Sequence, residues 1–326
     1  MKPFLITALL LPMYLFAQTP EKQGLREYLI LDKGDTIRFY IYNPDNIAKT
    51  KVFLYLQGTG VYPMVNADDS GYCCMNNFPK LLMRDFPKEY AFIYINKMGM
   101  PYYINRSRFD IPSRFTERNN VLDRAEVANK VLDYVLKNIY PNARTVAVLG
   151  HSEGTRVLAR LTSMNKKITH ICFAAGSGYS HLYDQVLLTR RKQMRGEISG
   201  QEAQEKISHL YSGIDRVLTD TASTSKYLEG DTYKWWFYEI NRPPIVDLIQ
   251  LSIPILVTIG SSDNKVPVEG ADYIKAEFTR LKKKNLTYKV FENADHGFQE
   301  MLTDGKRKDH WKEVFMDFLT FIEKTP

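Results

Sequence analysis

Cysteine is scarce in this sequence. The 326 residues include three cysteines, and an odd number this small does not support a disulfide framework. Cys172 lies in an apolar run, which favours a buried thiol that packs as a small hydrophobic side chain. Cys73 and Cys74 are adjacent, so they either form a vicinal disulfide or pair with a partner brought near by folding. No local motif marks any of the three as a nucleophile.

The sequence also has no cluster of metal ligands and no phosphate-binding loop. We therefore expect a protein that works without a metal or an organic cofactor. The net charge is +7, but the basic residues are scattered along the chain, so nucleic acid is not an expected partner. A hydrophobic fraction of 44% and a charged fraction of 25% are typical of a globular chain with ample material for a core.

One long apolar run is present, and it lies at the N-terminus. Lys2 precedes the apolar segment 4–16, which is short for a helix that spans a bilayer. Ala17 followed by Gln18 resembles a signal-peptidase cleavage site, and no cysteine follows that would carry a lipid. We expect residues 1–17 to be a cleaved signal peptide and the mature chain, 18–326, to be secreted or periplasmic, without a stable membrane anchor. An uncleaved N-terminal anchor is the alternative.

Apolar runs and helical periodicities alternate along the mature chain. The expected strands lie at 27–31, 36–42, 51–57, 90–96, 145–149, 170–174, 255–259 and 287–291. The expected helices of this alternating part lie at 78–84, 119–138, 155–164, 268–283 and 311–323. Continuous apolar strands that alternate with helices are typical of a mainly parallel sheet covered on both faces. We therefore predict an α/β fold around an eight-stranded sheet.

The segment 178–250 interrupts this alternation. It carries no strong strand pattern, its periodicity favours helices at 182–194 and 201–219, and it ends in an aromatic group at 233–238. A bare connection of this length is unusual, so we predict a helical insertion between the sixth and seventh strands. Ligands bind beside the carboxyl ends of parallel strands, and an insertion at that edge covers the crevice as a lid.

The sequence Gly150-His151-Ser152-Glu153-Gly154 joins the expected strand at 145–149 to the expected helix at 155–164. A serine between two glycines at such a turn is the pattern of a nucleophile elbow. The glycines permit a tight turn, and the turn lifts the serine hydroxyl above the sheet. We therefore predict Ser152 as a nucleophile. The backbone amide of Glu153, at a helix N-terminus, is predicted to donate to an oxyanion.

The elbow, the insertion and the motifs that follow resemble the α/β-hydrolase superfamily over essentially the whole mature chain. In particular, the chain resembles lid-bearing, secreted serine hydrolases of the esterase and prolyl-oligopeptidase-related groups. The resemblance implies that Asp263, which follows a glycine turn after the seventh strand and precedes Val266-Pro267, is the acid of a catalytic triad. It also implies that His296, on the loop after the eighth strand, is the general base.

Alternatives stay open for the acid. Asp231 and Asp295 are weaker candidates, because the first lies in the insertion and the second is the neighbour of His296 itself. Asp263 could also have a purely structural role as the cap of the helix expected from residue 268.

The loop after the third strand reads Gln57-Gly58-Thr59-Gly60, where many relatives in the superfamily have a His-Gly motif. We predict the amide of Thr59 as the second oxyanion donor, with Gly58 close to the substrate and the hydroxyl of Tyr62 as a further contact. A simple glycine turn is the alternative. Gln57 replaces the usual histidine, so the orienting role of that histidine does not carry over.

Two groups of side chains have a binding and a structural interpretation. Trp235 and Trp236 either line a substrate pocket or form the core of the lid. The loop after the fourth strand holds four arginines that either bind a substrate anion or pair with nearby carboxylates such as Glu117 and face water: Arg106, Arg108, Arg114 and Arg118.

These residues predict a serine hydrolase that cleaves a carboxylic ester through a Ser-His-Asp triad and an acyl-enzyme intermediate. The expected substrate is a small acyl ester. The alternative is a short peptide, cleaved by a serine peptidase or aminopeptidase of prolyl-oligopeptidase-like type. A third hypothesis is a catalytically silent binding protein on the same fold. A complete triad in the order of the superfamily argues against it, because a silent relative would be free to lose a member.

Overall fold

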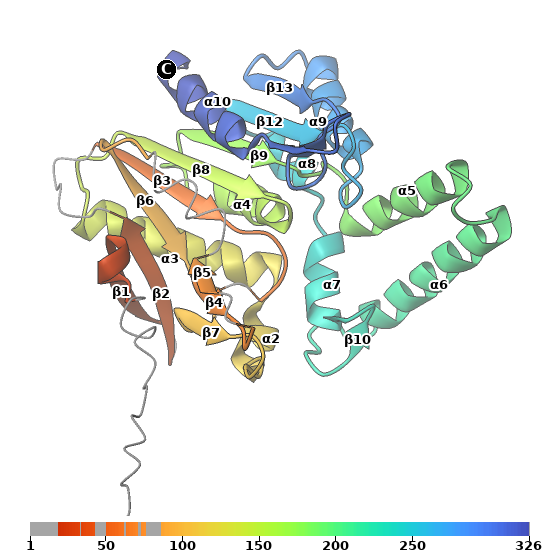
Figure 1. Cartoon of the computed structure of the whole chain (residues 1–326), viewed down its shortest axis with the longest axis horizontal. Coiled ribbons are helices and arrows are strands. Elements are labelled where there is room, and N and C mark those ends of the chain that lie inside the picture. The colour runs from red at the N-terminus through yellow and green to blue at the C-terminus, as the bar shows by residue number, and fades with distance from the viewer. Residues whose placement is uncertain are drawn as a thin grey trace, which may run out of the picture.

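An eight-stranded sheet forms the centre of the computed structural model (Figure 1). The structure describes residues 19–32, 34–42, 50–61, 63–70, 73–75 and 86–325. The strand order across the sheet is β1 (Leu25–Asp32), β2 (Asp35–Tyr42), β6 (Tyr90–Ile95), β3 (Lys51–Leu56), β8 (Thr145–His151), β9 (His170–Ala174), β12 (Ile255–Gly260) and β13 (Leu286–Phe291). The pairs β1–β2 and β2–β6 are antiparallel, and the other pairs are parallel. The predicted α/β fold with a mainly parallel eight-stranded sheet is confirmed.

Several expectations concern residues outside this description, namely the signal peptide at 1–17, the helix at 78–84 and the role of Tyr62. They stay predictions. Cys73 and Cys74 lie in β5 (Cys73–Met75), and their pairing also stays a prediction. Cys172 is buried and unpaired, as its apolar surroundings predicted. Within the described ranges, no helix combines the length and the apolar composition needed to cross a bilayer.

Both faces of the sheet are buried. Successive side chains along a strand point to opposite sides, so one strand contributes to the cores on both faces. In β3, Val52 packs in the hydrophobic cluster on one face and Phe53 in the cluster on the other. Within the described residues, the long helices that pack on the first face are α3 (Val121–Asn138), α4 (Glu153–Met164) and α9 (Val268–Arg280). The long helix that packs on the second face is α10 (Trp311–Lys324). Strands that are apolar on both sides need a helical layer on each side, so the continuous apolar runs predicted this architecture correctly.

The segment between β9 and β12 is a mainly helical insertion. Its elements are α5 (His181–Met194), α6 (Gly200–Leu218), β10 (Tyr227–Leu228), β11 (Asp231–Thr232), α7 (Tyr233–Ile240) and α8 (Pro244–Leu248). Figure 1 shows α5 and α6 as a hairpin that extends away from the sheet, with α7 between the hairpin and the body. α8 returns to the body, where Ile245 and Leu248 join the core beneath the sheet.

The insertion has a small core of its own, and Trp235 and Trp236 are part of it. It also contains the two-stranded ladder β10–β11, for which the sequence showed no strong strand pattern. The turn of this ladder places both Glu229 and Gly230 at positive φ, 50° and 90°. Two residues at positive φ are what a tight hairpin turn requires. Glutamate is an unusual first residue for such a turn, and strands of two residues are too short to show a periodicity. The sequence therefore does not predict this hairpin.

Short elements complete the fold, and the sequence did not predict them. They are η2 (Glu21–Gln23), α2 (Ser113–Arg118), a three-stranded sheet of β5, β4 (Val65–Ala67) and β7 (Tyr103–Asn105), and the pair β14 (Gln299–Met301) and β15 (Arg307–Asp309). Several boundaries differ by one or two residues, and the end of α9 differs by three, because this helix ends at Arg280 rather than at residue 283. Lys282 has a φ of 56°, and a left-handed residue of this kind ends a helix.

The end of β12 lies so close to the loop after β13 that only glycine fits there. A Cβ atom on Gly260 would overlap with the carbonyl oxygen of Ala294 and lie 2.6 Å from that of Asp295. We expect Gly260→Ala to lower the free energy of unfolding by about 3 kcal/mol, because backbone must move to admit the methyl group. Urea denaturation measures this change.

The control for this prediction is Gly200→Ala at the start of α6. There the new methyl group would meet only the end of the flexible Gln193 side chain, at 3.4 Å. Alanine is also a better helix former than glycine, so this variant should be as stable as the wild type or more so. Equal losses in the two variants would contradict the close-approach argument.

Candidate active site

Ser152 occupies the turn between β8 and α4, with φ 56° and ψ −126°. Two glycines make this turn possible. A Cβ atom on Gly150 would lie 2.5 Å from the carbonyl oxygen of Gly154, and one on Gly154 would overlap with the carbonyl oxygen of Leu56. A serine held in a rarely populated conformation by packing on both sides is the geometry predicted for a nucleophile elbow.

The structure brings together the three residues predicted as a triad. The Oγ atom of Ser152 lies 2.9 Å from Nε2 of His296. The Nδ1 atom of His296 lies 2.8 Å from Oδ2 of Asp263. Because a carboxylate can only accept, Nδ1 carries the proton and Nε2 is left to accept from the serine hydroxyl. The arrangement can therefore remove a proton from Ser152. The catalytic roles themselves remain predictions.

Asp263 is fully buried, and donors satisfy both of its carboxylate oxygens. Oδ1 accepts from the backbone N–H groups of Lys265 and Val266, at 2.8 and 2.9 Å, while Oδ2 accepts from His296. The cap of α9 is Pro267, which makes no side-chain hydrogen bond, so Asp263 orders the loop before the helix rather than capping it.

The two weaker candidates for the acid have other surroundings. Asp295 accepts from the backbone N–H groups of Gly297 and Gln299, at 2.8 and 2.9 Å, and so shapes the loop that carries His296. Asp231 lines the pocket from the insertion. The imidazole of His296 is bonded to Asp263.

His151, inside the elbow, makes a specific contact. Its Nε2 lies 3.2 Å from the carbonyl oxygen of His296, and its ring packs edge-on against Trp311. Burial and the neighbouring His296 lower the pKa of His151 to about 3, so the ring is neutral and Nε2 donates to that carbonyl. The elbow therefore supports the histidine loop directly. The contact spans 145 positions, and no local pattern reveals it.

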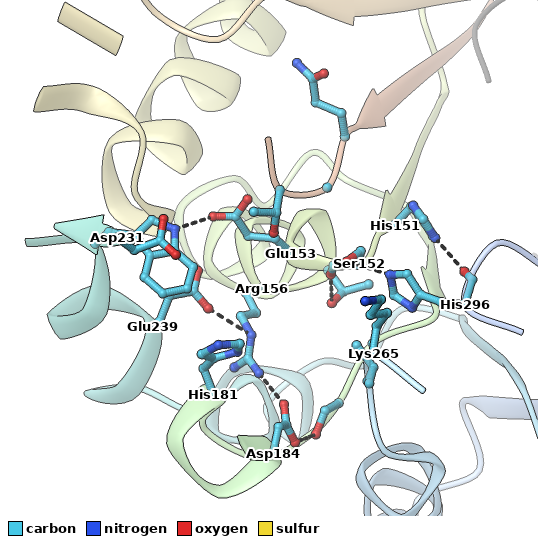
Figure 2. A pocket seen from close by; sticks show the side chains of 18 of the residues that line it. His151, Ser152, Glu153, Arg156, His181, Asp184, Asp231, Glu239, Lys265 and His296 are labelled. Atoms are coloured by element: carbon cyan, nitrogen blue, oxygen red, sulfur yellow. Dashed lines mark hydrogen bonds and ion pairs between the residues drawn. The ribbon is translucent and has the colours of Figure 1, made fainter. Parts of the chain in front are cut away.

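A cavity of about 710 Å³ adjoins Ser152 (Figure 2). Gly58, Thr59, Glu153 and Trp235, all predicted to bind substrate or oxyanion, line it. A Cβ atom on Gly58 would lie 3.0 Å from Cβ of Ser152, so the glycine loop lies directly against Ser152. The oxyanion roles of the Thr59 and Glu153 amides remain predictions.

Trp236 follows the alternative interpretation, because it packs in the core of the insertion. Its Nε1 donates to the carbonyl oxygen of Leu228 at 2.7 Å. Gln57, in the place of the usual histidine, points to the neighbouring strand. Its side chain accepts from the hydroxyl of Tyr94 at 2.8 Å and donates to the carbonyl of Ile95 at 3.3 Å.

The four arginines of the 106–118 region have different roles. Arg106 lines the cavity, so the binding interpretation stays open for it. Arg108 pairs with Asp69, and Arg114 and Arg118 both pair with Asp35. For these three arginines the structural interpretation holds.

Glu153 is the residue after the nucleophile, and its side chain belongs to a buried ionic cluster. Its Oε2 accepts from Arg124 at 2.8 Å and lies 3.7 Å from Nζ of Lys97, while its Oε1 accepts from the indole of Trp235 at 2.8 Å. Burial alone would raise the pKa of Glu153, but Arg124 and Lys97 outweigh it and lower the pKa to about 2. Burial and the repulsion of Arg124 lower the pKa of Lys97 to about 7.

Arg156, one helical turn after Ser152, forms a second buried cluster with the insertion. It bonds to Asp184 of α5 at 2.6 Å and pairs with Glu239 of α7 at 3.0 Å. Ser177 also donates to Asp184. One guanidinium cannot compensate fully for two buried carboxylates, so burial raises the pKa of Asp184 to about 6 and that of Glu239 to about 8.

The first cluster predicts a large stability effect at Arg124. In Arg124→Met, Glu153 keeps Trp235 and the more distant Lys97 but loses its closest cation. Removing one partner of a buried ion pair should lower the free energy of unfolding by about 3 kcal/mol. Lys167→Met is the control, because it breaks an exposed pair with Asp133 and should leave the urea midpoint nearly unchanged. A small loss in Arg124→Met would show that Lys97 alone neutralises Glu153.

The second cluster predicts a pH dependence of stability. The folded-state pKa of Glu239, about 8, exceeds its ordinary value of 4.5, so between these values the folded protein holds a proton that the unfolded chain has lost. The free energy of unfolding then falls as pH rises through this window. Glu239→Gln should flatten this fall, as followed by urea denaturation from pH 5 to 8. Glu205→Gln, on the exposed face of α6, should keep the wild-type slope; equal slopes in all three proteins would refute the prediction.

Part of the chain is similar to a known protein family. Residues 222–325 match the model of the dienelactone hydrolase family, which is described as "DLH: Dienelactone hydrolase family". This match covers the end of the insertion, Asp263 and His296, and it does not include Ser152. No curated protein sequence matches the chain.

Solved structures resemble the whole chain in fold. Est1E from Butyrivibrio proteoclasticus is 12% identical with a TM-score of 0.55, over 91% of this chain and 99% of that one. An esterase from Pyrococcus furiosus is 13% identical with a TM-score of 0.55, over 93% of each chain. The acylaminoacyl peptidase of Pyrococcus horikoshii is 13% identical with a TM-score of 0.55, over 92% of this chain but 42% of its own.

The family match and the structural likeness agree on the class of protein. Identities this low establish the fold rather than a substrate, and together with the family match they indicate a hydrolase built on it. The chain has the α/β-hydrolase fold.

Proposed function

We propose that this protein is a serine hydrolase that cleaves carboxylic esters through an acyl-enzyme intermediate. The observation that carries the proposal is the hydrogen-bonded series Ser152–His296–Asp263, with links of 2.9 and 2.8 Å, at the edge of a cavity large enough for a small ester. The residue at the elbow is a serine rather than an aspartate. A serine hydroxyl becomes a nucleophile when a neighbouring base takes its proton, and the position of His296 beside Ser152 supports this step of acyl transfer.

The proposed reaction has two halves. Nε2 of His296 takes the proton of Ser152 while Oγ attacks the carbonyl carbon, and the amides of Thr59 and Glu153 stabilise the oxyanion. His296 then gives that proton to the departing alcohol, which leaves an ester on Ser152. A water molecule, deprotonated by His296, attacks this ester, and Ser152 recovers its proton as the carboxylic acid departs. Asp263 keeps the imidazole in the required tautomer throughout and stabilises the imidazolium.

A peptide substrate is the second candidate, and one observation favours it. A peptidase that removes residues from an N-terminus needs a carboxylate to hold the substrate amino group, and Asp231 and Glu239 line the cavity from the insertion. The expected signal peptide adds a proposal on location, that the mature enzyme acts in the periplasm or outside the cell.

A fluorophosphonate probe tests the nucleophile. The wild type should be labelled at Ser152, and Ser152→Ala should not be labelled and should lose roughly 10⁴-fold or more in kcat on p-nitrophenyl esters. Ser163→Ala is the matched control, because Ser163 lies on the same helix with an exposed hydroxyl and should be neither labelled nor required. Peptide mapping of the labelled protein identifies the modified serine.

The outcomes separate the candidate functions. Absence of labelling in the folded wild type would contradict the serine-hydrolase proposal and favour a silent binding protein. Where labelling occurs, faster turnover of p-nitrophenyl esters than of aminoacyl p-nitroanilides supports an esterase. The reverse order would favour the peptidase.

A further inference from the structure

The end of the cavity formed by the insertion carries more carboxylates than the chain itself can neutralise. Asp231, from β11, and Glu239, from α7, both line the cavity. Figure 2 shows them on one side of the pocket, with Ser152, His296 and Lys265 on the other. The mechanism proposed for the triad uses neither carboxylate, so each needs an explanation of its own.

Asp231 is half-buried and has no hydrogen bond or ion pair from its side chain within the described residues. Burial and the neighbouring Glu153 raise its pKa to about 6, while Lys97 opposes this effect. At neutral pH the group is therefore mainly a carboxylate that faces the cavity without a partner. A structural carboxylate in such a place would normally be paired, as Glu153 is with Arg124.

Glu239 is 1% exposed, and only one of its oxygens has a partner. Oε2 pairs with Arg156 at 3.0 Å, whereas Oε1 makes no hydrogen bond within the described part of the chain. Arg156 is shared with Asp184, so it cannot serve Glu239 alone. Glu239 and Asp231 are near enough to interact electrostatically.

The charges at this end of the cavity do not balance. Four carboxylates belong to the two buried clusters and their surroundings: Glu153, Asp184, Asp231 and Glu239. Two arginines and one lysine face them: Arg124, Arg156 and Lys97. His181 also lies here, but burial and Arg156 lower its pKa to about 3, so it adds no positive charge near neutral pH. Near neutral pH, Glu239 is mainly protonated because its pKa is about 8, and Lys97 is only partly charged because its pKa is about 7. Arg124 pairs with Glu153, and Arg156 pairs with Asp184. Asp231 is therefore the charged carboxylate that has no ion pair of its own within the described residues.

We propose that Asp231 and Glu239 form a subsite that binds a primary ammonium group of the substrate, while the scissile carbonyl lies at Ser152. The inference rests on the proposed hydrolase function and narrows its substrate class to acyl compounds that carry an amino group remote from the bond cleaved. An ammonium group offers three N–H donors, which match the unpaired carboxylate at Asp231 and, once Glu239 releases its proton, the open oxygen of Glu239. Lys265, at the opposite end, is suited to the carboxylate of the released acid.

Binding of reaction products tests this subsite without a catalytic step. We use ω-amino acids with three, six and eight carbons, each paired with the unbranched fatty acid in which a methyl group replaces the ammonium group. For 6-aminohexanoate the partner is heptanoate. In calorimetry at pH 7.5, at least one ω-amino acid should bind the wild type about tenfold or more tightly than its partner. Asp231→Asn should reduce this preference by roughly tenfold.

Asp215→Asn is the matched control, because Asp215 is an exposed carboxylate on α6 of the same insertion. This variant should keep the wild-type preference. The subsite is contradicted if every fatty acid binds at least as tightly as its amino acid, or if Asp231→Asn retains the full preference. Preference lost equally in Asp215→Asn and Asp231→Asn would also contradict it, because the effect would then come from the general charge of the insertion.

A kinetic arm separates this inference from the proposed function. The p-nitrophenyl esters of the same acids should show the same preference in kcat/KM, again reduced in Asp231→Asn. If neither series of esters is cleaved while 6-aminohexanoate still binds through Asp231, the hydrolase proposal fails and the ammonium subsite stands. If uncharged esters are cleaved and the amino group brings no advantage in binding or in kcat/KM, the subsite fails and the hydrolase proposal stands.

Discussion

The rest of the site depends on one constraint, the close contact between the backbone of β3 and the backbone at the start of α4. A side chain at Gly154 would overlap with the carbonyl oxygen of Leu56, so β3 and α4 meet without side chains between them. This contact brings the Gly58 loop against Ser152 and holds the serine at a φ of 56°. The cost of that conformation is offset by the packing on both sides. The position of the hydroxyl is therefore a property of the sheet and of α4, and the histidine loop only has to reach it.

The same helix also connects Ser152 to the insertion. Glu153 and Arg156 both lie in the first turns of α4, both are buried, and both bond to the insertion, through Trp235 for Glu153 and through Asp184 for Arg156. Breaking these contacts would leave charges buried without partners, which costs several kcal/mol. The insertion is thus attached where the chemistry is proposed to occur. A change in the position of α7 would be felt directly at the residue that follows Ser152.

Much of the scaffold could be predicted because its causes are local. Continuous apolar strands indicated a sheet buried on both faces, and Gly150, Ser152 and Gly154 indicated the elbow by their spacing alone. Asp263 and His296 required the resemblance to a superfamily, which supplied the order of the motifs. The contacts of Glu153 could not be predicted, since its partner Trp235 lies 82 positions away. Charge pairs of this kind depend on where the insertion folds back, and no periodicity records that.

Burial of charge has opposite consequences in the two parts of the cavity. A carboxylate in a medium of low dielectric constant needs a cation or several donors to keep its charge. Arg124 meets this need for Glu153, and the pair is structural. No side chain of the described residues forms an ion pair or hydrogen bond with Asp231, so a ligand in the cavity would have to supply the cation or the donors. An uncharged acyl chain could fill the same volume and leave that carboxylate unpaired. Discrimination between substrates should therefore depend more on their charge than on their length.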